Sequence, residues 1–180
     1  MKKRRARMKE NSLADIIGFE GDRGDLYREI GRFVFEYSRL EHDLRSHLRR
    51  KAQVPFDFDT PIMSAFDFAR LCNAMIAVSE IEEADGKPDP VLKDLLKQAK
   101  AINDIRVAVV HGRWMSTYAG DRARHVSRNS MKPTNYFENE GDLDEQSDAI
   151  VKLRADLAEA VHAGNERRGP KAVKKRRKLD

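Results

Sequence analysis

Arg106 and His111 stand in a segment, INDIRVAVVHGRW, whose residue types could act on a phosphate. A histidine that exchanges protons near neutral pH suits general acid–base catalysis, and an arginine can bind the negative charge that develops on a phosphate. Helical periodicity places Arg106 within the apolar stripe of this segment. His111 falls at its carboxyl end, where the helix carbonyls favour the protonated ring. The pair predicts cleavage of RNA by its own 2′-hydroxyl, for which no metal ion is needed.

Glu41 is a second charge on an apolar face. The apolar spacing over residues 25–51 predicts a long amphipathic helix, and Glu41 falls inside its apolar arc. A buried charge is costly unless it is paired. Two interpretations follow: either Glu41 orients Arg106 towards a phosphate at the lip of a cleft, or the two residues pair across the fold and only fix the helix register.

Basic and aromatic residues follow His111 in a stretch that alternates as a β-hairpin does. The residues predicted to bind RNA are Arg113, Trp114, Arg122, Arg124 and Arg128. Arginines neutralise phosphates, and an indole ring can stack on an unpaired base. The alternative is that Trp114 packs on the helices while the arginines are solvated.

Four amphipathic helices must position these residues, and the periodicity places them at 25–51, 61–80, 90–110 and 142–164. Proline suits the first turn of the second and third helices, and Gly112 suits the position after the third. The predicted fold class is all-α. It is an up-down four-helix bundle with a β-hairpin insertion between the third and fourth helices.

The two ends of the chain are strongly basic. Residues 1–9 and 167–180 hold fourteen of the 35 Lys and Arg residues, so 21 remain in the middle against 29 acidic residues. The predicted organisation is a basic arm and lead-in over 1–24, a helical domain over 25–163, and a basic disordered tail over 164–180. Basic tails on an acidic body predict contact with a polyanion, or a tail that folds back on that body.

Composition excludes several classes of protein. No apolar run is long enough to cross a membrane, and LADIIGF is too short for the core of a signal peptide. The single cysteine, Cys72, fits a reducing compartment, and no Cys/His cluster has zinc spacing. We therefore expect a cytoplasmic protein that has no metal ion, no cofactor and no contact with membranes.

The helix order, the R-x4-H spacing of Arg106 and His111, the HGRW that includes His111, and FEYSRLEHDL in the first helix resemble the HEPN superfamily over residues 25–163. The resemblance implies an all-α bundle, commonly dimeric, in which the motifs of two protomers face each other. Many members are metal-independent endoribonucleases of toxin–antitoxin, phage-defence or CRISPR-associated systems, and they leave a 2′,3′-cyclic phosphate. By this resemblance Arg106 and His111 are the motif residues, and Glu41 matches an acidic position on the first helix.

The leading hypothesis is a toxin- or phage-defence-like endoribonuclease that acts as a homodimer, with RNA as substrate and an antitoxin protein as partner. Val107 stands where active members carry a polar residue, often Asn. That residue favours the alternative, a non-catalytic HEPN-like module that binds RNA or a protein. A third class is a structural scaffold protein in which Glu41 and Arg106 only fix the helix register.

Overall fold

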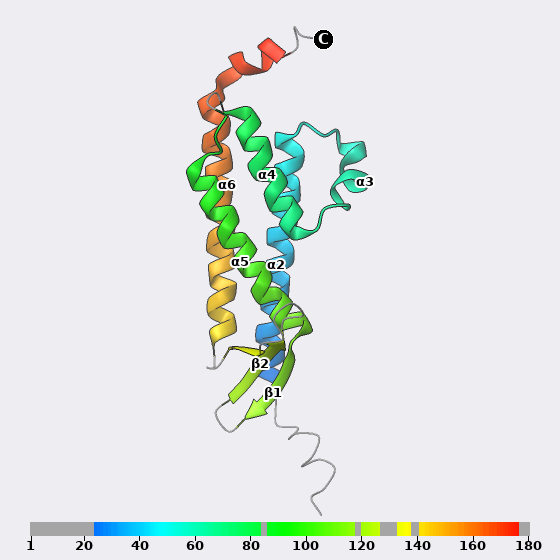
Figure 1. Ribbon diagram of the computed structural model, residues 1–180, viewed down its shortest axis with the longest axis vertical. Helices are drawn as coiled ribbons and strands as arrows, with labels where there is room; N and C mark the ends of the chain where they lie inside the picture. Colours follow the sequence, from blue (N-terminus) through cyan, green and yellow to red (C-terminus); the bar gives the residue numbers. More distant parts are fainter. Residues whose placement is uncertain (1–23, 84–85, 118–119, 127–132, 138–140, 177–180) are drawn as a thin grey trace, which may run out of the picture.

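The computed structural model describes residues 24–83, 86–117, 120–126, 133–137 and 141–176 (Figure 1). Four main helices account for most of these residues, which agrees with the predicted all-α class. They are α2 (Gly24–Lys51), α4 (Phe68–Glu82), α5 (Pro90–His111) and α6 (Asp142–Arg176). The 3-10 helix η1 (Phe56–Phe58) and the short helix α3 (Asp59–Met63) lie between α2 and α4.

The four main helices surround one core, but α2 and α4 run in the same direction. At the upper end of Figure 1, Lys51 Nζ lies 2.8 Å from a carboxylate oxygen of Glu82. Lower down, the rings of Tyr37 and Phe68 are 5.1 Å apart. Figure 1 shows α5 running the opposite way. The predicted up-down order is therefore wrong for the first two main helices.

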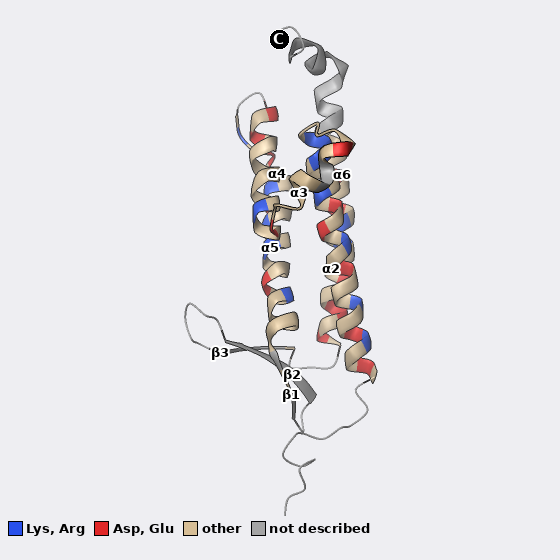
Figure 2. Cartoon of the chain, turned by 90° about the vertical axis from the view of Figure 1, so that its right-hand side faces the viewer, with Lys and Arg blue, Asp and Glu red and all other residues tan. Residues whose placement is uncertain are grey.

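Ion pairs show that α6 is also parallel to α2. Near the start of both helices, Arg32 Nη1 lies 2.9 Å from Asp144, and further along Arg154 Nε lies 2.8 Å from Asp43. Arg154 also contacts Glu36 at 3.0 Å, and both of these side chains are largely buried. Figure 2 shows acidic and basic residues along α2 and α6, where these pairs form. Because buried charges need partners, these contacts fix the register of the two helices.

The parallel arrangement of α2 and α4 is explained by the connection between them, residues 52–67, which is long enough to run back along α2. Arg45 of α2 holds this connection, because its guanidinium donates to the carbonyl oxygens of Met63 and Phe66, the latter at 3.3 Å. Asp67 then caps α4 by accepting from the backbone N–H three residues on, at 2.8 Å. The second main helix therefore begins at residue 68 and not at 61 as predicted.

The ends of α5 agree with the sequence prediction because they depend on local contacts. The Asp89 carboxylate accepts from the backbone N–H groups of Val91 and Leu92 at 2.8 and 3.3 Å. A proline follows at the first helical position. At the other end, the Gly112 N–H donates to the Ala108 carbonyl at 2.8 Å.

α6 is longer than predicted, since it continues past Gly164 to Arg176. The residues beyond Gly164 include Glu, Arg, Lys and Ala, which are good helix formers, and the helix also runs through Gly169 and Pro170, which are poor ones. The predicted boundary at residue 163 therefore does not mark the end of the helix. Within the described residues, no helix combines the length and the apolar character needed to cross a membrane.

An antiparallel sheet lies between α5 and α6, where the sequence predicts a two-stranded hairpin. The structure has three strands, β1 (Arg113–Thr117), β2 (Gly120–Val126) and β3 (Pro133–Tyr136), in the order β1-β2-β3. β2 is antiparallel to both of its neighbours. The sheet lies at the lower end of α5 (Figure 1).

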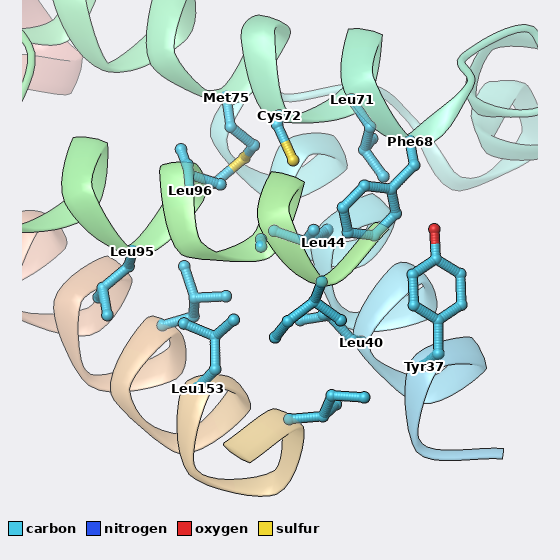
Figure 3. Packing of buried hydrophobic residues seen from close by; sticks show 14 of the residues in the cluster. Tyr37, Leu40, Leu44, Phe68, Leu71, Cys72, Met75, Leu95, Leu96 and Leu153 are labelled. Carbon is cyan, nitrogen blue, oxygen red and sulfur yellow. The ribbon is translucent and has the colours of Figure 1, made fainter. Parts of the chain in front are cut away.

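The core is formed by leucine, phenylalanine, methionine and cysteine side chains from all four main helices (Figure 3). Fully buried large side chains include Phe33, Leu40, Leu44, Leu71, Met75, Leu96, Leu143, Ile150 and Leu157. Burying one such side chain stabilises the fold by about 1.5–3 kcal/mol. Figure 3 shows residues of α4 closing this core over the part of α2 that begins at Tyr37.

Candidate functional site

As drawn in Figure 1, the lower half of the molecule holds the start of α2 and the end of α5, and the upper half holds α4. The lower half therefore lacks the cover that α4 gives to the upper half. α4 begins at Phe68, opposite Tyr37, and Figures 1 and 2 place it beside the upper half only. Below it, some apolar residues of α2 and α5 are exposed and others are half-buried. We call these residues the open face: Tyr27, Ile30 and Val34 of α2, and Val107 and Val110 of α5. The exposed fractions of Tyr27, Val34 and Val110 are 63%, 37% and 44%.

Arg106 lies on α5 beside the open face and is half-buried. Its guanidinium carbon lies 5.7 Å from the centroid of the Tyr37 ring, within the range of a cation–π contact. The Tyr37 hydroxyl donates to Oδ1 of Asn103 at 2.7 Å. Three side chains from α2 and α5 thus hold one another in place at the level where α4 begins.

The Tyr37 hydroxyl remains protonated, because its pKa is raised. Burial is the largest cause, and the nearby Glu41 carboxylate adds to it, while the Arg106 charge lowers the pKa. A protonated phenol keeps its hydrogen for the bond to Asn103. Tyr37 is therefore suited to positioning Arg106 and is not suited to acting as a base.

Glu41 does not make the contact with Arg106 that the sequence predicts. Its carboxylate accepts from Arg45 Nη2 at 2.5 Å, one turn further along α2. Within the described part of the chain, no ion pair within 4.0 Å joins Glu41 to Arg106. Glu41 instead orients the arginine that holds the connection between α2 and α4.

His111 is the last residue of α5 and its side chain is exposed. Five helical steps separate it from Arg106, which corresponds to a rise of about 7.5 Å and a rotation of about 140°. The two side chains therefore leave the helix in different directions. His111 is accessible to a ligand, and it lies at the lower edge of the open face.

Trp114 is engaged in packing. Its indole Nε1 donates to the carbonyl of Val109 at 3.0 Å, and its ring is stacked on Phe137 with centroids 5.9 Å apart. These contacts agree with the alternative interpretation of the sequence, in which Trp114 packs within the protein.

For the other residues predicted to bind RNA, the structure describes at most how their strands pair. The backbone register pairs Arg113 with Arg124, and Met115 with Arg122. Arg128 lies outside the described residues.

Two residues of this site, Tyr37 and Asn103, were not predicted from the sequence. Asn103 stands three residues before Arg106, on the same side of α5, which is a signal that could have identified it. Tyr37 reads as an ordinary member of the apolar stripe of α2 until the position of α5 is known. Its polar hydroxyl within that stripe is the only hint in the sequence.

Other chemistry-bearing groups lie away from the open face. Burial raises the pKa of the Cys72 thiol to about 12, so this cysteine is not a nucleophile at neutral pH. Among the described residues, no group of three or more His, Cys, Asp or Glu side chains could hold a metal ion. A hollow of about 400 Å³ lies between α2 and α6, and it is lined by Phe35, Ser38, Arg39, His42, Asp43 and Arg154.

Comparisons with family models, with characterised proteins and with solved structures found no match to this chain. The chemistry of the open face is therefore inferred from the residues that line it. They offer a positioned guanidinium, an exposed imidazole and apolar surface between them.

Proposed function

We propose that this chain is a HEPN-like, metal-independent endoribonuclease whose site is the open face. Arg106 and His111 are its catalytic residues, RNA is its substrate, and a homodimer is its working form. The observation that carries the proposal is the exposure of this region. Arg106 belongs to the core-facing arc of α5, yet it is only half-buried, and the apolar side chains of Val34 and Val110 on the same face are 37% and 44% exposed.

The reaction is an internal transfer at phosphorus. The 2′-oxygen of a ribose attacks the adjacent phosphate, and the bond from phosphorus to the 5′-oxygen of the next nucleotide breaks. The 2′-hydroxyl loses a proton and the leaving 5′-oxygen gains one, so the products are a 2′,3′-cyclic phosphate and a 5′-hydroxyl. Arg106 would bind the non-bridging oxygens as their charge increases. His111 would act as base, as acid, or by polarising the phosphate.

A second copy of the chain would complete this site. Because Arg106 and His111 leave α5 about 140° apart, one helix does not aim both groups along the same line. In a homodimer, each phosphate could meet groups from both copies, as the resemblance to HEPN proteins implies. The arginines of β1 and β2 would add phosphate contacts. If the protein is a toxin, an antitoxin protein would be its partner.

The test is cleavage of single-stranded RNA by the purified full chain in the presence of EDTA. We expect cleavage that persists in the chelator and yields cyclic phosphate ends. His111→Ala should lower the rate by about 100-fold or more, the usual range for loss of a general acid or base. His42→Ala is the matched control, because His42 is also an exposed histidine but lies on α2 beside the hollow. Cleavage that stops with EDTA, or that survives His111→Ala, would contradict the proposal.

Val107 favours a second candidate function, a non-catalytic module that binds RNA on the same surface. Val107 is half-buried and apolar, and Trp114 is engaged in packing. This alternative predicts RNA binding with steep salt dependence and no turnover. The variant Val107→Asn distinguishes the two, since restoring a polar residue beside Arg106 should produce cleavage only if the remaining site is competent.

A further inference from the structure

We infer that residues 13–19, which precede α2, pack on the open face of their own chain. On this face the described helices leave large apolar side chains exposed. Its apolar side chains come from two neighbouring helices, and the exposed fractions of Tyr27, Val34 and Val110 are large for such residues. An apolar surface that continues from a core commonly marks a binding site.

The sequence immediately before α2 has the composition to cover this face. Residues 13–19, LADIIGF, hold four large apolar residues in seven: Leu13, Ile16, Ile17 and Phe19. The segment is too short to form a core of its own, so its apolar side chains need another surface to be removed from water.

The segment can reach the open face from the point where α2 begins. Gly24 is the first residue of α2, at the lower end of Figure 1, and the open face occupies the first three turns of that helix. From Gly24 to Val34 the distance along the helix axis is about 15 Å. Residues 20–23 and the bonds that flank them can span about 17 Å when extended, so the link is long enough.

The charges of the segment and of the open face are complementary. Residues 10–22 carry Glu10, Asp15, Glu20 and Asp22 and no Lys or Arg. The open face is bordered by the guanidinium of Arg106. Opposite charges favour this pairing and set its orientation.

Disulfide trapping in the full chain tests this contact without reference to RNA cleavage. The variant Ile17→Cys/Val110→Cys should form a disulfide within one chain under mild oxidation, and Cys72 will not interfere because it is buried. The control is Ile17→Cys/Ile81→Cys, whose second cysteine is exposed near the upper end of α4. We expect the first pair to react at least about tenfold faster, because a docked segment has a high effective concentration. Equal rates would overturn the inference.

Two further outcomes are decisive. A disulfide that joins two chains in the first variant would show that a second copy supplies the segment, which also overturns the inference. Hydrogen exchange gives an independent readout: in Ile17→Asp, the amides of residues 27–34 should exchange faster than in the control Ala6→Asp. Unchanged exchange in Ile17→Asp would contradict the contact even if the cysteine variants failed to fold.

Discussion

The upper and lower halves of this molecule share α2, α5 and α6, but they differ in the partners that their buried or half-buried cations contact. In the upper half, α4 closes the core, and the charged side chain of Lys51, only 2% exposed, is neutralised by Glu82 at 2.8 Å. In the lower half, α4 is absent and Arg106 rests on an aromatic ring. The half-buried cation of Arg106 thus contacts an aromatic ring, whereas the buried cation of Lys51 contacts a carboxylate.

The length of α4 is what separates the halves. α4 has 15 residues, whereas α2 has 28 and α5 has 22, so α4 cannot cover both of its neighbours along their full length. The place where it begins is set by the connection that Arg45 holds. A polar network far from Arg106 along the chain therefore decides which part of α5 is exposed.

The largest loss of stability should come from removing a large side chain from the core of the upper half. Leu44→Ala removes a fully buried side chain and should lower the free energy of unfolding by about 2–5 kcal/mol. Val110→Ala, on the open face, should cost no more than about 1 kcal/mol because its side chain is 44% exposed. Denaturant unfolding of both variants checks the comparison, and similar losses would mean that the two halves are equally closed.

An intermediate effect should come from the contacts that join the halves at Tyr37. Tyr37→Phe keeps the ring under Arg106 and removes the hydrogen bond to Asn103, which should cost about 1 kcal/mol. Tyr37→Leu also removes the cation–π contact and should cost about 0.5–1 kcal/mol more. Tyr27→Phe, an exposed tyrosine on the same helix, is the control and should leave the unfolding midpoint unchanged. A Tyr37→Phe variant as stable as the wild type would show that the Tyr37 hydroxyl does not stabilise the fold.

The smallest effect should be a pH dependence that arises in the upper half. Burial lowers the pKa of His47 from its ordinary value of 6.5, and the charge of Arg50 lowers it further. The unfolded chain therefore takes up this proton before the folded chain does, so stability falls as the pH drops below 6.5 towards the lowered value. His47→Gln should flatten the dependence of the unfolding free energy on pH in this window. An identical slope in both proteins would mean that other groups cause it.

The sequence predicted the parts of the fold that depend on neighbours along the chain. The ends of α5 follow from Asp89 and Gly112, whose bonds close within the helix termini. The start of α4 was misplaced, and so was the direction of α4 relative to α2, because both depend on Arg45 reaching carbonyl groups about twenty residues away. Such long-range contacts are not encoded in periodicity.

The candidate site, like the fold, was predicted where it depends on neighbours along the chain and was missed where it depends on long-range contacts. Helical periodicity correctly identified Arg106 as a charge on the core-facing side of α5, but not the residue on which it rests. Glu41 was placed against Arg106 in both interpretations, although Arg45 stands four residues after it on the same helix. Glu followed by Arg at that spacing is a favourable local pair, so the nearer partner was available in the sequence. The ring of Tyr37 could be recognised only after the helices were placed.

The shared direction of α2 and α6 has a practical consequence for attaching anything to this protein. The first described residue, Gly24, and the last, Arg176, lie at opposite poles of the molecule (Figure 1). The length of α2 alone puts about 40 Å between those poles. A label attached at Gly24 therefore lies three residues from Tyr27, whereas one attached at Arg176 lies at the far pole. Of these two positions, Arg176 is the one that keeps a label away from the open face.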